Sequence, residues 1–257
     1  MPARNTAGRS QTLPRLGLPE RISACLFDLD GVLTRTAEVH RTVWREVFDE
    51  FLAESGSESD RPFTDQDYLT YVDGKPRRDG VSHFLASRGI QLPAGDPDDP
   101  PTARTIAALA NRKQERLLDA LNTDGVRVYE GSVGYVRKVR SAGLATAVVT
   151  SSANSSAILD AAGIDDLFDV QVDGLVAPQE GLAGKPAPDT FVAAAKALGL
   201  EPAAAAVFED ALAGVAAGRA GGFGYVVGVD RAGHAEALRE RGADIVVADL
   251  AELLESA

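Results

Sequence analysis

Short apolar segments alternate with helical patterns over the second half of the chain. Residues 144–149 and 225–229 are apolar and rich in β-branched side chains, as buried strands commonly are. The intervening segments space apolar residues three and four positions apart. The pattern predicts strands at 25–27, 144–149, 168–172, 205–208, 225–229 and 245–248, and helices at 135–142, 155–162, 188–198 and 212–220. Such alternation predicts an α/β fold, a Rossmann-like parallel sheet core with helices on both faces.

A long and purely helical pattern interrupts this alternation directly after the first predicted strand. Val39, Val43 and Val47 recur at four-residue spacing, as on one face of an amphipathic helix. Further helical patterns cover residues 65–71, 80–87 and 103–121, separated by a loop at 91–102 that is rich in proline, aspartate and glycine. We therefore expect an inserted all-helical domain at 36–121, an α/β core at 21–35 and 122–257, and a loose N-terminal tail at 1–20.

The composition limits the classes of partner. The 257 residues carry 26 basic and 38 acidic side chains, for a formal net charge of −12. So acidic a chain argues against a dedicated nucleic-acid or membrane surface, although a local cation can still bind an anionic substrate. No apolar run approaches the roughly 20 residues that span a bilayer, and residues 1–20 lack the apolar segment of a signal peptide. The single cysteine, Cys25, cannot form an intramolecular disulfide, so we expect a cytoplasmic protein.

Candidate chemistry is clearest after the first predicted strand. Asp28 and Asp30 follow residues 25–27 and, two positions apart on an extended chain, point the same way. Gly31 then permits a sharp turn. Two like charges this close need a cation or a shared proton. Because open α/β sheets bind ligands outside the carboxyl ends of their strands, we expect a hard, oxygen-seeking ion such as Mg²⁺ here.

Two later strand ends carry polar groups suited to an anion and its metal. Ser151 lies in a run of hydroxyl residues after the second predicted strand, where hydroxyl and backbone N–H donors can meet a phosphate. Glu209 and Asp210 follow the fourth predicted strand, where they would complete an oxygen cage with Asp28. Taken alone, both features have an ordinary alternative, because serine and aspartate also cap helix N-termini.

Two loops carry basic residues in this acidic chain. Lys185 lies between a glycine and two prolines, which stiffen the chain before a helix and would hold the ammonium near a phosphoryl group. The basic loop 74–80, with Arg77, suits a second anionic group or sugar hydroxyls. Each loop is equally compatible with a solvated turn. The histidines lack metal-ligand spacing, and we expect His83 and His234 at the surface.

Taken in order, these residues resemble the haloacid dehalogenase superfamily of phosphotransferases. The matching positions are Asp28 and Asp30, then Ser151, then Lys185 with the following Pro-x-Pro-Asp, then Glu209 and Asp210. The resemblance runs from about residue 22 to the C-terminus. Within the superfamily the chain looks most like the β-phosphoglucomutase-like family, supported by residues 36–38, His40, Trp44, Arg77, residues 111–113 and residues 184–191.

The resemblance implies Mg²⁺-dependent phosphoryl transfer through an aspartyl phosphate. Asp28 would be the nucleophile and Asp30 the general acid and base toward a sugar hydroxyl. Ser151 and Lys185 would bind the transferring phosphoryl oxygens. The Mg²⁺ ligands would be the Asp28 side chain, the Asp30 backbone carbonyl, Glu209 and Asp210. The inserted domain would be a cap that closes over the site and excludes water.

The resemblance also implies a set of substrate contacts. Arg77 and Lys113 would hold the distal phosphate or the sugar, Asn154 and Ser155 would flank the phosphoryl site, and His40 and Trp44 would lie at the cap–core junction. Arg35 and Gly80 depart from the family pattern, which usually has an aspartate and a hydroxyl residue there, so they bear on substrate choice.

Two reactions stay open at this point. The first is interconversion of β-glucose 1-phosphate and glucose 6-phosphate through a bound bisphosphate. The alternative is hydrolysis of a small sugar phosphate by a phosphatase of the same superfamily. Arg77 and Lys113 favour the mutase, because a second phosphate needs a second anchor. In either case we expect a monomer whose partner is a small phosphorylated sugar.

Overall fold

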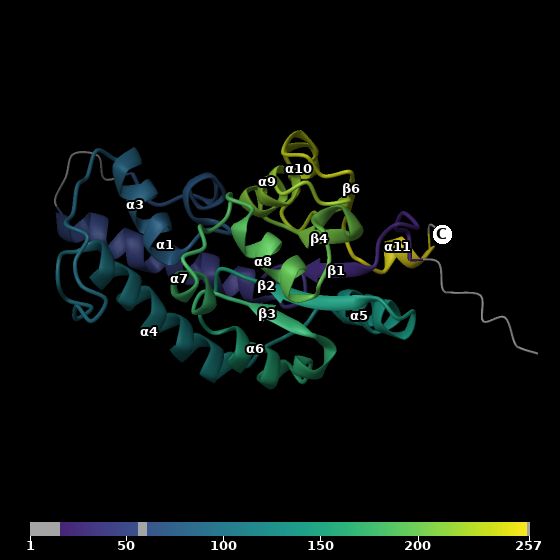
Figure 1. Ribbon diagram of the computed structural model, residues 1–257. Coiled ribbons are helices and arrows are strands. Elements are labelled where there is room, and N and C mark those ends of the chain that lie inside the picture. Colours follow the sequence, from purple (N-terminus) through teal and green to yellow (C-terminus); the bar gives the residue numbers. More distant parts are fainter. Residues whose placement is uncertain (1–15, 56–60, 256–257) are drawn as a thin grey trace, which may run out of the picture.

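The computed structural model describes residues 16–55 and 61–255 and contains one six-stranded sheet (Figure 1). All its strand pairs are parallel, and the order across the sheet is β3-β2-β1-β4-β5-β6. The strands are β1 (Ala24–Phe27), β2 (Ala145–Val149), β3 (Val170–Val172), β4 (Ala205–Glu209), β5 (Tyr225–Val229) and β6 (Ile245–Val247). The predicted α/β fold is confirmed, and the first strand in sequence lies at the centre of the sheet.

Alternate side chains of each strand enter two different apolar cores. Cys25 and Phe27 of β1 face one core, whereas Ala24 and Leu26 face the other. The first face is covered by α5 (Glu130–Ser141), α6 (Ser155–Ala162) and α11 (Glu252–Glu255), and the second by α8 (Asp189–Ala197), α9 (Leu212–Ala220) and α10 (Ala235–Glu240). Burial of both faces explains why the strands are continuous apolar runs rather than alternating ones.

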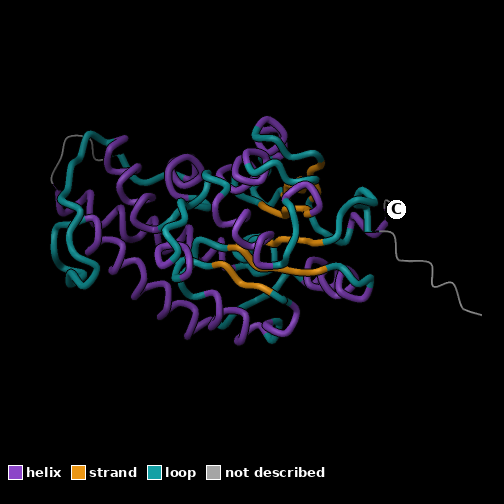
Figure 2. The backbone as a smooth tube through the Cα atoms, viewed as in Figure 1, coloured by secondary structure: helices purple, strands orange, loops and turns teal. Residues whose placement is uncertain are grey.

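The described residues between 36 and 124 form a separate helical unit, which we call the cap; the remainder is the core. Its elements are α1 (Thr36–Ser55), α2 (Asp65–Asp67) with the π-helix η1 (Tyr68–Val72), α3 (Arg77–Ser87) and α4 (Ile106–Asp124). Phe48, Phe63 and Phe84 pack with ring centroids 4.2 to 5.0 Å apart at its centre. Figure 2 shows this unit as helices and loops beside the strands of the core. Among the described helices, none is long and apolar enough to cross a membrane.

Two chain segments join the cap to the core, and they are hydrogen-bonded to each other. The Arg35 N–H donates to the Arg127 carbonyl at 2.8 Å, and the Tyr129 N–H donates to the Leu33 carbonyl at 2.9 Å. The exposed Arg35 side chain lies over the Tyr129 ring, 4.9 Å from its centroid. Arg35 therefore belongs to the hinge between cap and core, not to the cavity described below.

Several helix bounds differ from the predicted ones. Helix α5 begins at Glu130 rather than at residue 135, because its first turn is polar and carries no apolar period. The segment predicted as one helix at 65–71 divides after Asp67: Thr64 and Asp67 form a capping box, and the wider π turn that follows buries Tyr68 and Val72. Three short helices were not predicted: α7 (Val176–Gln179), α10 and α11.

The predicted loose tail is only in part described. Residues 1–15 lie outside the described residues. Residues 16–20 are not loose, because Leu16 is buried in the first core and its carbonyl accepts a hydrogen bond from Tyr135 at 2.8 Å. Burying an apolar side chain and satisfying a buried tyrosine hydroxyl together hold this segment against the sheet.

Candidate active site

The central strands bring the predicted carboxylates together at one edge of the sheet. Phe27 of β1 is level with Phe208 of β4, so Asp28 and Glu209 come side by side at the carboxyl ends. Asp210 follows directly. Asp28 is 5 % exposed, Glu209 0 % and Asp210 8 %. Three carboxylates are thus buried where ligands of such sheets bind.

Lys185 reaches this acidic group from the loop before α8. Its Nζ lies 2.5 Å from Asp28 Oδ1 and 2.7 Å from Glu209 Oε1, and it also donates to the Val149 carbonyl at 3.1 Å. Burial opposes its charge, but the neighbouring Asp28 and Glu209 carboxylates outweigh that effect and raise the pKa of Lys185. The ammonium is therefore a fixed positive charge beside the predicted nucleophile.

One lysine does not neutralise three acids. Burial raises the pKa of Asp28 despite the attraction of Lys185, and Glu209 and Asp30 raise it further. Burial, with Asp73 and Glu209, likewise raises the pKa of Asp210. The site therefore lacks positive charge when it holds only protein atoms.

A divalent cation fits this excess of negative charge. One oxygen each from Asp28, Glu209 and Asp210 lie within 4.8 Å of one another. Carboxylate oxygens are the ligands that Mg²⁺ prefers. A side chain at Gly31 (φ +90°) would collide with the Asp210 carboxylate, so only glycine allows the turn after Asp30 to approach this group.

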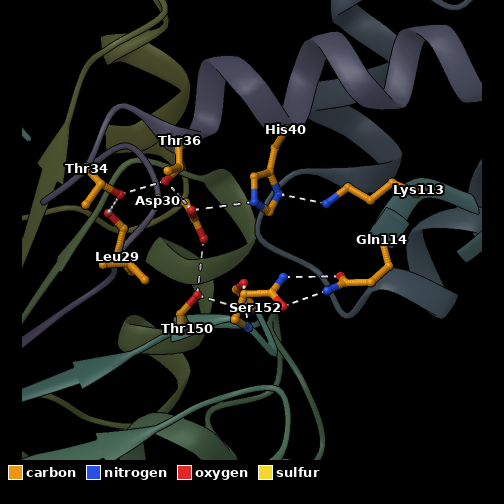
Figure 3. A network of polar contacts seen from close by, with 10 residues as sticks. Leu29, Asp30, Thr34, Thr36, His40, Lys113, Gln114, Thr150 and Ser152 are labelled. Atoms are coloured by element: carbon orange, nitrogen blue, oxygen red, sulfur yellow. Dashed lines mark hydrogen bonds and ion pairs between the residues drawn. The ribbon is translucent and has the colours of Figure 1, made fainter. Parts of the chain in front are cut away.

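Asp30 anchors a chain of polar contacts that runs from the core into the cap (Figure 3). Its carboxylate accepts from Thr36 and, at 3.3 Å, from Thr150. His40 Nε2 lies 3.6 Å from Asp30 Oδ1, and His40 Nδ1 is 3.1 Å from Lys113 Nζ. Hydrogen bonds from two threonines thus fix the orientation of the predicted acid and base, and the His40 imidazole lies beside it.

Burial shifts both basic groups of this chain toward their neutral forms. Desolvation, then the charge of Lys113, lowers the pKa of His40 to about 4. Desolvation, then the charge of Arg77, lowers the pKa of Lys113 to about 7. Lys113 contacts the Trp44 ring at 5.4 Å, which favours its charged form only weakly. An anion beside Lys113 would restore its proton, because opposite charges favour ionisation.

A cavity of about 60 Å³ lies between the cap and the carboxyl ends of the strands. Most predicted site residues line it: Asp28, Asp30, Ser151, Asn154 and Asp210 from the core, and His40, Trp44, Arg77 and Lys113 from the cap. Lys185 and Glu209 lie behind Asp28. The volume is that of about two water molecules, far less than a hexose phosphate. Cap and core lie in contact around this cavity, an arrangement that we call closed.

Direct contacts hold the closed arrangement. The side-chain amides of Gln114 and Asn154 exchange two hydrogen bonds, 2.6 and 3.2 Å long, across the boundary between cap and core (Figure 3). The Ser151 hydroxyl donates to the Gly74 carbonyl at 2.9 Å. Ser151 therefore serves cap closure here. Thr150, which the sequence reasoning missed, is the hydroxyl that approaches Asp30. The signal that could have found it is its position as the first residue after β2.

Two further expectations need correction. Ser155, expected beside the phosphoryl group, is fully buried outside the cavity, and its hydroxyl donates to Asp173 Oδ2 at 2.7 Å. It is a structural link between α6 and the end of β3. His234, expected at the surface, is 13 % exposed in its side chain, and its Nε2 lies 3.1 Å from the Asp210 carbonyl. It supports the backbone of a predicted metal ligand. His83 is exposed, as predicted.

Comparisons with known proteins agree with this geometry. The family model described as haloacid dehalogenase-like hydrolase matches residues 22–222. A β-phosphoglucomutase of Mycobacterium bovis is 53 % identical, over 93 % of this chain and 94 % of its own length. A fructose-1-phosphate phosphatase of Escherichia coli is 30 % identical, over 80 % of this chain and 96 % of its own. The crystal structure of CbbY from Rhodobacter sphaeroides in complex with phosphate superposes with a TM-score of 0.67 at 28 % identity, covering 90 % of this chain and 96 % of that one.

Proposed function

The chain belongs to the haloacid dehalogenase-like hydrolase family, and from that premise we propose that it is a β-phosphoglucomutase. The supporting observation is that basic side chains lie at two ends of the cavity. Lys185 lies at Asp28 on the core side, and Lys113 with Arg77 lies on the cap side. A substrate with two anionic ends, such as a sugar bisphosphate, matches both. The 53 % identity to a protein named as this mutase supports the same substrate class.

Asp28 is the group that takes the phosphoryl group. One of its carboxylate oxygens bonds to phosphorus while the bond from phosphorus to the sugar oxygen breaks, which leaves an aspartyl phosphate. Asp30 gives its proton to the departing sugar oxygen. In the reverse half-reaction Asp30 takes the proton of another sugar hydroxyl, whose oxygen attacks phosphorus, and the Asp28 carboxylate leaves. Starting from the aspartyl phosphate, transfer to the 6-hydroxyl of β-glucose 1-phosphate gives the bisphosphate, and transfer of its 1-phosphoryl group back to Asp28 then releases glucose 6-phosphate.

The hydrogen bonds of Asp30 suit this exchange of a proton. Thr36 and Thr150 hold its carboxylate, and the histidine behind it is neutral at physiological pH, since burial lowers the pKa of His40 to about 4. A neutral His40 does not compete for the proton that Asp30 transfers. Lys113 in turn orients His40.

Asp28, Glu209, Asp210 and the Asp30 backbone carbonyl would hold Mg²⁺. When bound, the ion supplies positive charge that offsets the like charges of the phosphoryl group and of Asp28. Lys185, which contacts both Asp28 and Glu209, contributes further positive charge. Neutralisation and alignment are the main requirements of phosphoryl transfer, and these residues meet both.

Cap closure decides between transfer to a sugar and transfer to water. The Gln114–Asn154 pair and the Ser151–Gly74 bond close the cap directly over the phosphoryl site. A closed cap favours a sugar hydroxyl as acceptor, because it admits little bulk water. The second candidate function, a sugar-phosphate phosphatase, is favoured by the relative named as a fructose-1-phosphate phosphatase and by room for about two waters in the cavity.

The experiment that separates these functions is phosphorus NMR of the protein with Mg²⁺, β-glucose 1-phosphate and a trace of glucose 1,6-bisphosphate. The mutase proposal predicts a growing glucose 6-phosphate signal at constant total ester. Growth of inorganic phosphate instead would contradict it and establish the phosphatase. Arg77→Ala gives a second readout: loss of a distal anchor should weaken use of the bisphosphate by about 10-fold or more, yet spare a small phosphoryl donor such as acetyl phosphate.

We propose that the protein acts in the cytoplasm as a monomer on a small phosphorylated sugar. The buried thiol of Cys25 supports the first part, since it forms no disulfide within the chain. Size-exclusion chromatography with light scattering tests the second, and a dimer mass would overturn it.

A further inference from the structure

A loop outside the cavity contacts both chain segments that carry the predicted metal ligands. It covers residues 230–234, between β5 and α10. Sequence reasoning gave Arg231 no role and expected His234 at the surface. Their side chains are only 15 % and 13 % exposed, and neither lines the cavity. Any part that they take in phosphoryl transfer therefore acts through other residues.

Arg231 fixes the backbone of the Gly31 turn. Its Nε donates to the Gly31 carbonyl at 2.9 Å. Its terminal nitrogens donate to Ser132 Oγ at 3.2 Å and to the Ala248 carbonyl at 2.5 Å, and its guanidinium lies 3.6 Å from the centroid of the Tyr129 ring. These other contacts hold the guanidinium on the core, so its Nε keeps the Gly31 carbonyl in one place.

The Gly31 turn lies between two predicted Mg²⁺ ligands. The Asp30 carbonyl belongs to the peptide unit that enters Gly31, and a side chain at Gly31 would overlap the Asp210 carboxylate. The N–H of Gly31 donates to the Thr34 carbonyl at 2.8 Å. Because peptide units are planar, holding both the N–H and the carbonyl of this flexible residue also fixes the direction of the Asp30 carbonyl.

His234 holds the second acidic segment in a similar way. Its Nε2 lies 3.1 Å from the Asp210 carbonyl, and since a carbonyl only accepts, Nε2 carries the proton and donates. The N–H of the same peptide unit, that of Ala211, donates to Glu209 Oε2 at 2.8 Å. One planar unit thus links His234 to Glu209, and its orientation sets the direction of the carboxylates on both sides.

The loop that carries both residues is fixed by its own hydrogen bonds. Asp230 Oδ1 accepts from the backbone N–H groups of residues 232, 233 and 234, at 3.2, 2.7 and 2.9 Å. The Asp230 N–H donates to the Val247 carbonyl at 2.8 Å, which attaches the loop to the end of β6. Arg231 and His234 therefore extend from one rigid frame toward two separate segments.

We propose that Arg231 and His234 are positioning residues that set the spacing between segments 28–31 and 209–211. Each holds one backbone carbonyl of its segment, so the ligands that a divalent cation would bridge are in place before the ion binds. Ligands fixed in advance need less ordering on binding, which favours affinity. This inference rests on the proposed function only in that it takes these acids as Mg²⁺ ligands, and it is the same for a mutase and for a phosphatase.

The competing explanation is that the two side chains only stabilise the fold. Arg231 joins several elements of the core, and His234 is the N-cap residue of α10. A purely stabilising role would lower the free energy of unfolding and leave the affinity of the folded protein for Mg²⁺ unchanged. A positioning role weakens Mg²⁺ binding even where every molecule is folded.

The test is isothermal titration calorimetry of the full chain with Mg²⁺, at a temperature at which circular dichroism shows each variant to be folded. Arg231→Met and His234→Phe keep the size of the side chain but remove the donor. Arg231→Gln and His234→Gln keep an N–H donor at the place of the nitrogen that contacts the carbonyl. The matched controls are Arg239→Met and His83→Phe, at exposed positions.

We expect the Kd for Mg²⁺ to rise about 10-fold or more in Arg231→Met and in His234→Phe, because partners that orient metal ligands commonly contribute about 10- to 100-fold in affinity. The two glutamine variants should stay within about 3-fold of wild type, since the hydrogen bond to the carbonyl is kept. Arg231→Gln should still melt at a lower temperature, because it loses the contacts of the terminal nitrogens. Both controls should match wild type.

A Kd within about 3-fold of wild type in Arg231→Met and His234→Phe would overturn the proposal, as would equal losses in the glutamine variants. If Arg231→Met does not fold, Arg231→Gln against wild type and His234→Phe against His234→Gln still decide it. A wild type that binds no Mg²⁺ would refute the metal assignment itself, whereas binding by wild type with unchanged variants would refute this inference alone. Release of inorganic phosphate in the NMR experiment would replace the mutase by the phosphatase and leave this test as it stands.

Discussion

The basic side chains in the core half of the site and those in the cap half have different kinds of partner. In the core, Lys185 is 2 % exposed and lies within 2.7 Å of both Asp28 and Glu209. In the cap, Lys113 has a neutral histidine as its hydrogen-bonding partner and Arg77 a backbone carbonyl at 3.4 Å. Across residues 16–55 and 61–255, neither cap residue forms an ion pair within 4 Å. The core pairs its buried lysine with two carboxylates, whereas the cap holds basic groups whose counter-charge a substrate can provide.

This contrast has a physical reason. In the proposed mechanism the core holds its nucleophile in one geometry through every half-reaction, and paired buried charges are rigid. In the same mechanism the cap opens and closes, and groups that pair only with the substrate would link closure to binding. Four predictions test the contrast, from the largest expected effect to the smallest.

Asp28→Asn tests whether the core nucleophile is indispensable. The amide is the same size but cannot attack phosphorus, so we expect kcat to fall about 10⁴-fold or more with the fold retained. Mass spectrometry after incubation with acetyl phosphate and Mg²⁺ should find a phosphorylated wild-type chain and an unmodified variant. Phosphorylation of the variant, or activity within 100-fold of wild type, would remove Asp28 from its assigned role.

Lys185→Ala tests whether the pairing of Lys185 with Asp28 and Glu209 stabilises the core. The variant leaves Asp28 and Glu209 buried without a partner, so the free energy of unfolding in urea at pH 7 should fall by about 3 to 5 kcal/mol. Mg²⁺ should recover part of that loss, because it neutralises the same carboxylates. Lys196→Ala, at an exposed position of α8, is the control and should stay within about 0.5 kcal/mol of wild type. If the free energy of unfolding fell no more than in the control, the contacts of Lys185 with Asp28 and Glu209 would not be needed for stability.

The pH dependence of substrate binding tests whether Lys113 in the cap binds an anion. Because burial lowers its pKa to about 7, the free enzyme loses this charge as pH rises through 7, and KM for a sugar phosphate should rise about tenfold from pH 7 to 8.5. The Lys113→Met variant should have a high KM that does not change over this range. If KM of that variant still rose about tenfold from pH 7 to 8.5, the titration would belong to another group.

Stability provides a second check on Lys113. Between its folded pKa near 7 and its ordinary value of 10.5, the unfolded chain binds more protons than the folded one. The free energy of unfolding of wild type, relative to Lys113→Met, should therefore increase as pH rises across that window. A decrease over the same interval would contradict the lowered pKa.

Gln114→Ala tests the hydrogen bonds that join cap and core, for which we expect the smallest effect. It removes two hydrogen bonds between cap and core, each worth about 1 kcal/mol, and so shifts the cap toward its open arrangement. We expect kcat/KM to fall about 3- to 10-fold and release of inorganic phosphate to increase relative to transfer to sugar. The control is Glu115→Ala, the exposed neighbour on the same helix. If the two variants had equal effects, the Gln114–Asn154 hydrogen bonds would not be what holds the cap closed.

Much of the core could be predicted from local pattern. Helix α9 and strand β5 have the bounds that the apolar periodicity predicts, and all six predicted strands are present with ends shifted by at most two residues. Fully buried parallel strands are continuous apolar runs, so the signal is strong. Helix α10 was missed because its six residues bury only Leu238, which gives no periodicity to detect.

The core half of the site was predictable for a related reason. Asp28, Glu209 and Asp210 come directly after or at the end of strands, and parallel strands present their ends at one edge of the sheet. Ser151 shows that the strand end could be predicted but not which of its residues faces the site. A shift of one residue moves a side chain to the other side of the chain, and Thr150 is the residue that reaches Asp30.

The cap half depended on contacts between segments far apart in sequence. The partners Gln114 and Asn154 are 40 positions apart, and Ser151 and Gly74 are 77 apart. No local pattern encodes how the cap lies on the core, because that placement follows from packing and hydrogen bonding between two separately formed units. Asp73 is the clearest case: in sequence it is a loop acid, and only the folded chain places it at the cavity.

The amino-acid sequence by itself thus determined the parallel sheet, the inserted helical unit and the carboxylates, hydroxyls and lysine at the strand ends. Periodicity and strand-end geometry are local properties that survive in the linear order of residues. The tertiary structure alone decided which hydroxyl faces Asp30, which acid and which amides line the closed cap, and how burial moves Lys113 and His40 toward their neutral forms. Those outcomes depend on distance and on exclusion of water, and neither exists until the chain has folded.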